Sequence, residues 1–412
     1  MKALVFEQWN GGHYTNYLQC LVPEVARVSD EVVLAVDATM RQTLSDSPAV
    51  SSLRNVTFAP DLPPVGPSLR PGDRLAATRN LLDSLRTVRP DYTLLPSADA
   101  QTAGMVLHKL RAGRELRALG PIEGTFHYGY GYAAAGVKER LKEWVYSATY
   151  RGAPYDSVNF VNFAYYEYAQ GCGLIEPDRL RFVGDPVPQP ERIGREAARR
   201  LLGLDPVGRY VGLFGVLDRR KAVPELLAAF RRADLAASDR LVLGGRLDPT
   251  YAELIATEYA DLVRAGRIVV IDRFLTGREL ESAYEALDVA TVVYYRFPGL
   301  ASLALKAVAA GTPVLAHDFG WLRALVRRFE VGVTTDIFDP ARFASDLRRC
   351  LDAPSAHASS EAVTRLLRFH EEANFVARMT SGLRRAAGAP ATASVEWNWV
   401  LEAVPPARRA LA

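Results

Sequence analysis

The stretch "RFPGLASLALKAVAAGTPVLAHDFG", residues 296–320, contains the pattern from which the fold can be predicted. Pro298 and Gly299 indicate a loop, an apolar segment with helical spacing begins at Ser302, and the run after it is typical of a buried strand. No Asp or Glu occurs in residues 289–317. The stretch therefore predicts a loop that leads into a helix with no negative charge in its first turn.

The same order of strand and helix recurs along the chain. Apolar runs typical of buried strands lie at residues 3–6, 32–36, 56–59, 92–95, 123–126 and 157–161, and again at 210–214, 241–243, 268–271, 289–294 and 314–316. Amphipathic stretches typical of helices lie between them, among others at residues 74–87, 137–150, 224–233, 251–265, 279–287, 303–310 and 321–329. This alternation predicts parallel sheets covered by helices on both faces.

The length of 412 residues is too great for one ordinary core and predicts two domains of about 200 residues each. The proline-rich segment "GDPVPQPER", residues 184–192, has the composition of a linker. We therefore expect an α/β protein with two tandem doubly wound Rossmann-like domains that face a cleft. The expected domains are residues 1–186 and 187–388, followed by an Ala- and Pro-rich tail, 389–412, expected to pack back on the first domain.

The composition excludes several classes of protein. Hydrophobic residues make up 49% and charged residues 24%, which is ordinary for a soluble globular enzyme. The net charge of +3 is too small to indicate a nucleic-acid partner. The three cysteines, Cys20, Cys172 and Cys350, lie far apart without metal-ligand spacing, which favours a reduced, cytoplasmic chain. We see no signal-peptide core and no membrane span, whereas peripheral membrane contact stays open.

Two first-domain strands end in candidate site residues. In "EQWNGGHYTNYL", residues 7–18, Gly11 and Gly12 allow a close approach of the backbone to a ligand, and His13 lies at the tip of the loop. The alternative is a tight turn with a surface histidine. His127 ends the fifth predicted strand, where a lone histidine is either structural or functional. For Asp99, which ends the fourth strand, we favour the N-cap of the next helix over a functional role.

The second domain contains two candidate anion-binding elements. Arg219, Arg220 and Lys221 cluster at a helix entrance, where cations are unfavourable unless an anion joins them. The alternative is a solvated charge cluster. Backbone N–H groups from Gly299 to Ser302 can hold phosphate oxygens without any side chain. Lys306 lies four residues after Ser302 on the same helical face, and it either adds a positive charge there or extends into solvent.

Several second-domain segments carry a resemblance to a known family. "VGLFGVLDRRKAVPELLAAF", "LVLGGRLDP", "DRFLTGRELESAYEALDVATVVYY" and "PGLASLALKAVAAGTPVLAHDFG" resemble the donor-binding half of nucleotide-sugar glycosyltransferases with the GT-B fold. The closest group is the large retaining family with sucrose synthase-like and mannosyltransferase-like members (group 1 type). The resemblance covers about residues 180–350 and extends to the first half mainly in its layout.

The resemblance implies a role for each matching residue. It implies a first domain that binds the acceptor and a second that binds the donor. His127, Arg220 and Lys221 would be catalytic, with His127 facing the donor sugar and the two cations on the donor diphosphate. The donor-binding set would be Gly12, Arg219, Arg273, Phe274, Gly299, Leu300, Ala301, Ser302 and Lys306, with Arg273 and Phe274 beside the nucleobase. Gly11 and His13 would lie on the acceptor side.

The sequence also departs from the family pattern. The family has two glutamates separated by seven residues, and this chain has Pro298 and Lys306 at those positions. The family arginine of the earlier loop is replaced by Val216, so that Arg219 or Arg220 would substitute for it.

The function that the resemblance implies is transfer of a sugar from a nucleoside diphosphate, with UDP among the candidates, to an acceptor hydroxyl with retention of configuration. We expect no metal and no cofactor beyond the nucleotide-sugar donor. The acceptor is a small molecule, a lipid or a saccharide. One alternative is a catalytically degenerate GT-B protein that acts as a binding or regulatory subunit. A sugar-nucleotide epimerase is another, and it would need a carboxylate such as Asp99 in the site.

Tyrosines are concentrated in one part of the first domain. Nine of the 18 tyrosines fall between Tyr128 and Tyr168. Core packing explains them, and an aromatic acceptor pocket is the alternative.

Overall fold

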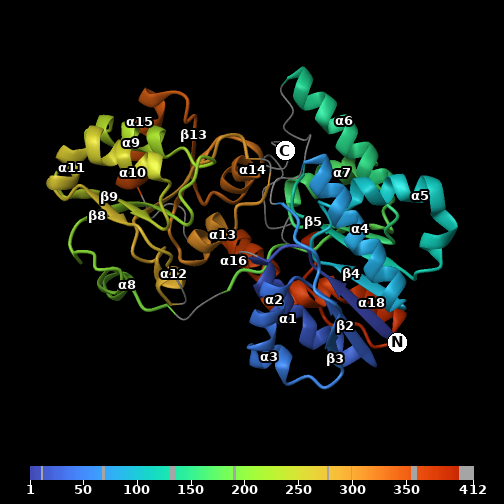
Figure 1. The fold of residues 1–412 in the computed structure, drawn as a ribbon. Helices are drawn as coiled ribbons and strands as arrows, with labels where there is room; N and C mark the ends of the chain where they lie inside the picture. The colour runs from blue at the N-terminus through green and yellow to red at the C-terminus, as the bar shows by residue number, and fades with distance from the viewer. Residues whose placement is uncertain are drawn as a thin grey trace. The chain divides into compact units, whose positions relative to one another are not determined.

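The computed structural model describes residues 1–10, 13–66, 70–129, 136–188, 192–275, 278–297, 299–353 and 360–398, without the side chains of His13, Arg117 and Arg278. The chain divides into two compact units (Figure 1). The first contains Met1–Pro186 and Glu372–Val395, and the second contains Val187–Glu371 and the segment that starts at Glu396. The sequence analysis places residues 372–388 in the second domain, whereas the structure groups them with the first unit.

The first unit is built on a parallel seven-stranded sheet in the order β3-β2-β1-β4-β5-β6-β7. The strands are β1 (Lys2–Phe6), β2 (Glu31–Ala35), β3 (Val56–Phe58), β4 (Tyr92–Leu95), β5 (Ile122–Phe126), β6 (Ser157–Phe160) and β7 (Leu180–Phe182). Its helices are α1 (His13–Val28), α2 (Ala38–Ser45), α3 (Pro48–Ser51), α4 (Pro71–Val88), α5 (Thr102–Arg117), α6 (Val137–Gly152), α7 (Phe163–Gly171), α17 (Glu372–Met379) and α18 (Ser381–Ala386).

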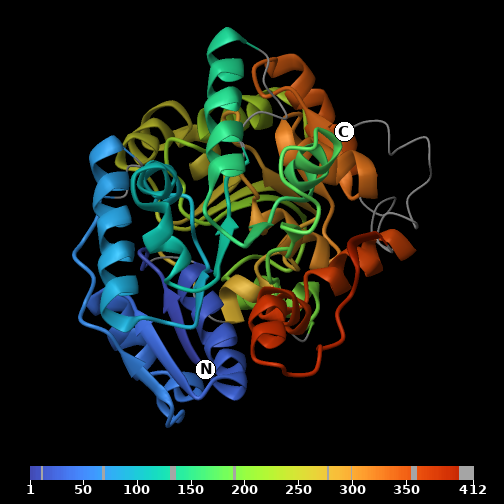
Figure 2. The same ribbon diagram turned by 90° about the vertical axis from the view of Figure 1, so that its right-hand side faces the viewer.

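The central strands of the first unit are buried on both faces, whereas the edge strand β3 is partly exposed. Successive side chains of a strand point to opposite sides of the sheet. In β1, Leu4 and Phe6 pack in the cluster with α4 to α7, whereas Ala3 and Val5 pack in the cluster with α1, α2, α3 and α18. The C-terminal helices α17 and α18 lie beside α1 (Figures 1 and 2). This contact explains why the chain after residue 371 belongs to the first unit.

The second unit is built on a parallel six-stranded sheet in the order β10-β9-β8-β11-β12-β13. The strands are β8 (Arg209–Phe214), β9 (Asp239–Gly244), β10 (Ile268–Ile271), β11 (Val289–Val292), β12 (Val314–His317) and β13 (Gly332–Thr335). Its helices are α8 (Arg195–Leu201), α9 (Val223–Arg232), α10 (Pro249–Glu258), α11 (Ala260–Arg264), α12 (Arg278–Ser282), α13 (Ser302–Ala309), α14 (Gly320–Phe329), α15 (Pro340–Asp352) and α16 (Glu361–Phe369).

The predicted α/β class with two tandem Rossmann-like sheets is confirmed, and every predicted strand is present. The sequence analysis missed β7 and β13. It also predicted one helix at residues 251–265, whereas the structure has α10 and α11 with the non-helical Tyr259 between them. The predicted helix at 279–287 is only the short α12.

Candidate functional site

The centre of the second sheet is a topological switch point. The first strand of this unit, β8, pairs with β9 on one side and with β11 on the other. The connections that leave β8 and β11 therefore diverge, and the carboxyl ends of two such strands are where doubly wound sheets bind their ligands. The loop from Gly215 to Ala222 follows β8, and residues 294–297 and 299–301 follow β11.

Lys221 is buried at the switch point, with only 2% of the residue exposed. Its backbone forms an antiparallel bridge with Tyr294, just past β11. Its ammonium group donates a hydrogen bond to the carbonyl of Phe214, the last residue of β8. The same Nζ lies 5.8 Å from the centre of the Tyr294 ring. Lys221 therefore joins the ends of the two central strands.

Burial makes the charged form of Lys221 unfavourable. The loss of solvation lowers the pKa of Lys221 to about 7. Asp218 opposes this shift, and the neighbouring Arg220 contributes to it. A buried lysine without a close carboxylate is costly to keep charged. An anion bound beside Lys221 would supply the negative charge that stabilises its ammonium form.

The space beside Lys221 depends on a glycine. Gly215 has a φ of +99°, and a Cβ placed there would lie 3.1 Å from Nζ of Lys221 and 3.1 Å from Cδ1 of Leu303 in the first turn of α13. The ammonium group of Lys221 and the first turn of α13 thus both lie close to Gly215. Gly245, at the end of β9, also needs to be a glycine, because its φ is +129° and a Cβ would collide with the carbonyl of Gly215.

The start of α13 has no side-chain cap. Its N-cap residue is Ala301, which makes no capping hydrogen bond, and its first turn carries no acidic residue. The first N–H groups of a helix lack intrahelical partners and carry a partial positive charge. Gly299 is buried under the ring of Phe297, which would contact a Cβ at 2.7 Å. Lys306 is half-buried one turn after Ser302.

The three cations of the predicted cluster have different environments. The side chain of Arg219 is 80% exposed and lies 3.9 Å from Asp248. The side chain of Arg220 is 60% exposed and pairs with Asp218 at 2.8 Å. Lys221 alone is buried. The structure therefore brings only one of the three into the interior of the switch point and leaves two on the surface of the loop.

Arg273 and Phe274 follow β10, the edge strand two positions away from β8. Arg273 forms an ion pair with Glu279 at 2.6 Å, and the ring of Phe274 is exposed. An exposed aromatic ring at the carboxyl end of a strand can stack on a flat ligand.

Aromatic residues that the sequence analysis did not select also lie at the strand ends. Tyr294 stacks on Phe297 with ring centroids 5.2 Å apart. His317, the last residue of β12, is buried against Phe319 and Phe338, and burial lowers its pKa. The sequence analysis already placed Tyr294 at the end of a predicted strand, but its pairing with Lys221 has no local signal in the sequence.

In the first unit, His127 lies at the end of β5 and is 8% exposed. Its Nε2 is 2.9 Å from the carbonyl of Pro96, which can only accept, so Nε2 is the donor of this hydrogen bond. The ring stacks on Tyr17 at 5.6 Å and meets Tyr14 edge-on at 5.5 Å. These contacts hold the imidazole in one orientation.

Asp99 is not the N-cap that we favoured, because α5 begins after Gln101. Its carboxylate instead accepts hydrogen bonds from the backbone N–H groups of His127 (2.9 Å) and Tyr128 (3.3 Å). Burial raises the pKa of Asp99 to about 7, although these two hydrogen bonds oppose the shift. A short polar side chain looks the same in sequence in either role.

Glu7 was missed by the sequence analysis. It directly follows β1, is fully buried, and accepts a hydrogen bond from Trp9 N–H through Oε1 at 2.9 Å. Its Oε2 has no hydrogen-bond partner among the described residues. Burial raises the pKa of Glu7 well above its usual value, and the negative charge of Asp99 adds to the shift. The buried Glu7 and the half-buried Asp99 thus accompany His127 at the strand ends of the first unit.

Tyr17 connects His127 to the start of the predicted linker, residues 184–192. Its hydroxyl donates a hydrogen bond to the buried Asp185, and its ring lies 4.8 Å from that of Phe375 in α17. This arrangement explains why Asp185 is buried although it belongs to a proline-rich stretch.

Three predicted positions lie outside the described residues. They are Gly11, Gly12 and Pro298, and the side chain of His13 is likewise outside them although its backbone begins α1.

The tyrosines of the first unit pack mainly in its core. Tyr150 contacts Phe126, Phe160 and Tyr165, and its hydroxyl donates to the carbonyl of Tyr128 at 2.8 Å. This favours the packing interpretation over an aromatic acceptor pocket.

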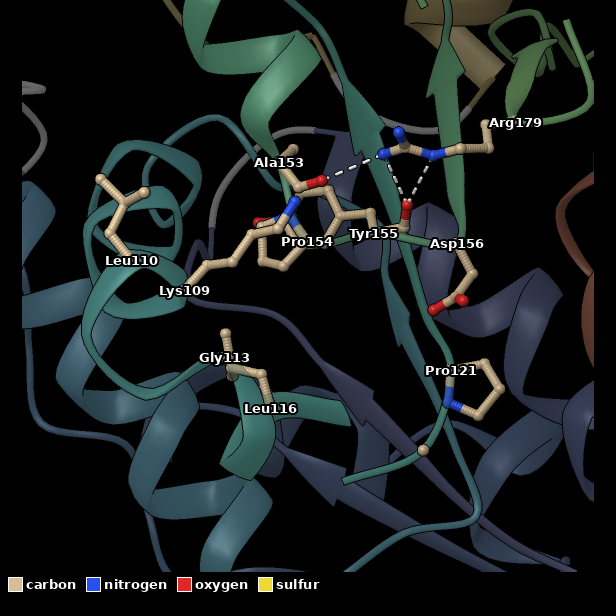
Figure 3. A pocket seen from close by; sticks show the side chains of 11 residues that line it. Lys109, Leu110, Gly113, Leu116, Pro121, Ala153, Pro154, Tyr155, Asp156 and Arg179 are labelled. Carbon is tan, nitrogen blue, oxygen red and sulfur yellow. Dashed lines mark hydrogen bonds between the residues drawn. The ribbon is translucent and has the colours of Figure 1, made fainter. Parts of the chain in front are cut away.

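A pocket of about 640 Å³ opens at the opposite edge of the first sheet, at the amino ends of β5, β6 and β7 (Figure 3). Arg179 borders it and donates to the carbonyls of Ala153 (3.0 Å) and Tyr155 (2.8 Å). The guanidinium also pairs with Glu176 at 2.9 Å, so its donors are already occupied within the first unit. None of the predicted site residues lines this pocket.

Comparison with known proteins identifies the central part of the second unit. Residues 208–353 match the family described as "Glycosyl transferases group 1". This segment is therefore a group 1 glycosyltransferase domain, and it contains the switch point with Lys221 and α13.

Curated relatives match a similar share of the chain. The chain is 33% identical over 205 residues to a D-inositol 3-phosphate glycosyltransferase 1 of Catenulispora acidiphila, with 43% of this chain and 48% of that protein covered. It is 37% identical over 177 residues to a D-inositol 3-phosphate glycosyltransferase of Thermomonospora curvata, with 40% and 39% covered. The matched part thus spans less than half the length of these relatives.

Solved structures match nearly the whole chain at low identity. HepE of Anabaena, solved in complex with UDP and glucose, has a TM-score of 0.64 at 16% identity, with 93% of this chain and all of that chain covered. Sucrose-phosphate synthase of Thermosynechococcus elongatus has a TM-score of 0.61 at 17% identity, with 97% and 96% covered. These likenesses confirm the predicted GT-B fold.

Proposed function

We propose that the protein is a glycosyltransferase that moves a sugar from a nucleoside diphosphate donor to a hydroxyl group of an acceptor. The observation that carries the proposal is the buried ammonium group of Lys221 beside the uncapped start of α13. Both features favour an anion, and they lie in the segment that matches group 1 glycosyltransferases.

The proposed reaction places its negative charge on the leaving group. The bond between the sugar C1 and the diphosphate breaks, C1 bonds to the acceptor oxygen, and the acceptor proton passes to a phosphate oxygen. Lys221 and the N–H groups of Leu300 to Ser302 would stabilise the departing diphosphate. The scheme needs no metal and no further cofactor. Retention of configuration is proposed on the resemblance to the retaining family alone.

The remaining side chains have supporting roles in the proposal. Arg219 and Arg220 are exposed on the same loop as Lys221 and would add charge for the diphosphate. Phe274 would stack on the nucleobase and Arg273 would lie beside it. His127 would contact the transferred sugar, which is the role that the resemblance to the family implies.

The names of the similar proteins suggest which substrates to test first. HepE was solved with UDP and with UDP-glucose, which supports a UDP-sugar as the donor. The curated relatives are named for D-inositol 3-phosphate, which makes this compound the first acceptor to assay. Other small molecules, saccharides and lipids form the rest of the acceptor panel.

The experiment combines nucleotide binding with a transfer assay. Calorimetry would measure the affinity of UDP, GDP, dTDP and ADP for the wild type and for Lys221→Ala and Arg220→Ala. Arg231→Ala is the matched control, because Arg231 is also a half-exposed, ion-paired arginine of the second unit. We expect one diphosphate to bind, with a loss of roughly 50-fold or more in Lys221→Ala and about 3- to 10-fold in Arg220→Ala.

Mass spectrometry of donor and acceptor mixtures would then detect the glycosylated product. Near-normal turnover in Lys221→Ala would contradict the role assigned to this residue. Nucleotide binding without transfer or donor hydrolysis would favour the alternative, a binding or regulatory subunit. The comparisons favour the enzyme, because the curated relatives are named glycosyltransferases.

A further inference from the structure

The outer face of α6 carries an unusual set of exposed apolar side chains. Val137 is 86% exposed, Leu141 61% and Trp144 69%, and the neighbouring Val145 is also exposed. In a helix, residues spaced by three, four, seven and eight lie on one side. These four side chains therefore form a continuous apolar stripe, which we call the α6 stripe.

Cations border the α6 stripe on both sides. Lys138 and Lys142 follow one edge, and Arg140 and Arg151 follow the other, since each pair is displaced from the stripe by about a quarter of a turn. All four residues are exposed. The outer face of α6 thus combines apolar residues with positive charge.

The acidic and tyrosine side chains of α6 face inward. Glu143 accepts a hydrogen bond from the hydroxyl of Tyr168, and Glu139 accepts one from the N–H of Gly136 at 3.1 Å. Tyr146 is contacted by Arg74 of α4, and Tyr150 is buried in the core of the first unit. The inner face explains how α6 is attached, whereas no part of this packing uses the α6 stripe.

The position of α6 leaves the stripe accessible. The N-terminal end of α6 projects from the rest of the first unit in both views (Figures 1 and 2). At the other end of the helix, the carbonyl of Gly152 accepts a hydrogen bond from Lys109 of α5 at 3.2 Å. The next residue of α5, Leu110, is itself exposed. The apolar and basic character therefore continues onto α5.

We propose that the outer face of α6 docks on an anionic lipid bilayer. A helix that lies in a membrane interface has an apolar side with an aromatic residue, bordered by Lys and Arg that reach anionic headgroups. The α6 stripe with Trp144 and the four bordering cations has this arrangement. A basic rim complements a negatively charged lipid surface and would repel the equally basic face of a second copy.

The docking is peripheral. In the described part of the chain, no helix combines the length and hydropathy that a membrane crossing requires. The 16 residues of α6 can lie parallel to the surface over about 24 Å. Docking does not depend on the proposed glycosyltransferase activity, because it is measured without donor or acceptor.

The test is sedimentation of the full-length protein with sucrose-loaded vesicles. We expect binding to vesicles of phosphatidylcholine mixed with phosphatidylglycerol, weaker binding to pure phosphatidylcholine, and release by high salt. Leu141→Glu combined with Trp144→Glu should lower the partition coefficient roughly tenfold or more. Lys138→Gln combined with Lys142→Gln should lower it about 10- to 30-fold for anionic vesicles only.

The matched control is Val207→Glu, which places the same charge at an exposed valine of the second unit and should bind like the wild type. Thermal unfolding would verify that the variants are folded. Emission from Trp144, obtained by comparison with Trp144→Phe, should shift to shorter wavelength on vesicles.

Two results would overturn the proposal. One is a wild type that does not sediment with anionic vesicles, or a Leu141→Glu/Trp144→Glu variant that binds them as well as the wild type does. The other is a dimer in sedimentation velocity without lipid that the same double variant dissociates, because the α6 stripe would then be covered by a second copy.

Discussion

The lowered pKa of Lys221 predicts that donor affinity depends on pH. The buried amine has a pKa of about 7 in the free protein, compared with 10.5 for an ordinary lysine. A bound diphosphate would favour the ammonium form and raise the pKa of Lys221 again. Binding above pH 7 therefore requires that the protein take up a proton.

The magnitude follows from the fraction of protein that is already protonated. At pH 7 about half of the free sites carry the ammonium ion, and at pH 9 only about one in a hundred does. If the complex stays protonated, affinity falls about fivefold from pH 7 to pH 8 and about 50-fold from pH 7 to pH 9, or about 2.3 kcal/mol. Below pH 6 the affinity should be constant.

The assay is calorimetric titration with an intact UDP-sugar, whose two phosphates remain ionised across this range. Titrations at pH 8.5 in buffers with different ionisation enthalpies should show uptake of close to one proton. Arg231→Ala should reproduce the wild-type pH profile. The reasoning would be refuted by an affinity that is constant from pH 6.5 to pH 9, or by proton release on binding.

Three further predictions follow from the buried groups. Replacing Lys221 by Met should raise the free energy of unfolding in urea by roughly 1 to 3 kcal/mol at pH 7. Wild-type stability should rise between pH 7 and 10.5, because the unfolded chain binds one more proton than the folded protein in this range, and the Met variant should lack this rise. A less stable variant would contradict this. Gly215→Ala should abolish diphosphate binding while the protein stays folded, because the added methyl group would fill the space beside Lys221. Gly215 also has a φ of +99°, which favours glycine. Unchanged affinity in calorimetry would show that the ligand does not use this space. Asp99 has a raised pKa of about 7, so its contribution to wild-type stability should fall as pH rises from 4 to 7. The free energy of unfolding of Asp99→Asn, relative to that of the wild type, should therefore increase by about 2 to 4 kcal/mol from pH 4.5 to pH 8. A stability difference between the two proteins that does not change with pH would be evidence against the raised pKa of Asp99.

The sequence was sufficient to predict the central strands and one edge strand of each sheet, β3 and β10, but not the opposite edge strands, β7 and β13. Strands buried on both faces appear as uninterrupted apolar runs, which is why β8 and β11 could be predicted. β7 has only three residues, and β13 contains a glycine, two threonines and partly exposed positions, so neither has this signal. The break at Tyr259 was missed because apolar spacing continues through it.

For the candidate site, the sequence predicted residues but not their environments. Arg219, Arg220 and Lys221 are equivalent as a run of cations, and only the bridge to Tyr294 determines that Lys221 is the buried one. Side-chain direction in a loop depends on pairing with a distant strand, which local patterns do not encode. Glu7 was missed because a polar residue after a strand usually faces solvent, and nothing in the local sequence indicates that this one is buried.

The most direct measurement is a crystal structure of the protein with UDP. The account predicts that the diphosphate lies at the carboxyl ends of β8 and β11, with a phosphate oxygen about 3 Å from Nζ of Lys221 and others facing the N–H groups at the start of α13. A nucleotide bound elsewhere on the second unit, with Lys221 still donating to Phe214, would contradict it.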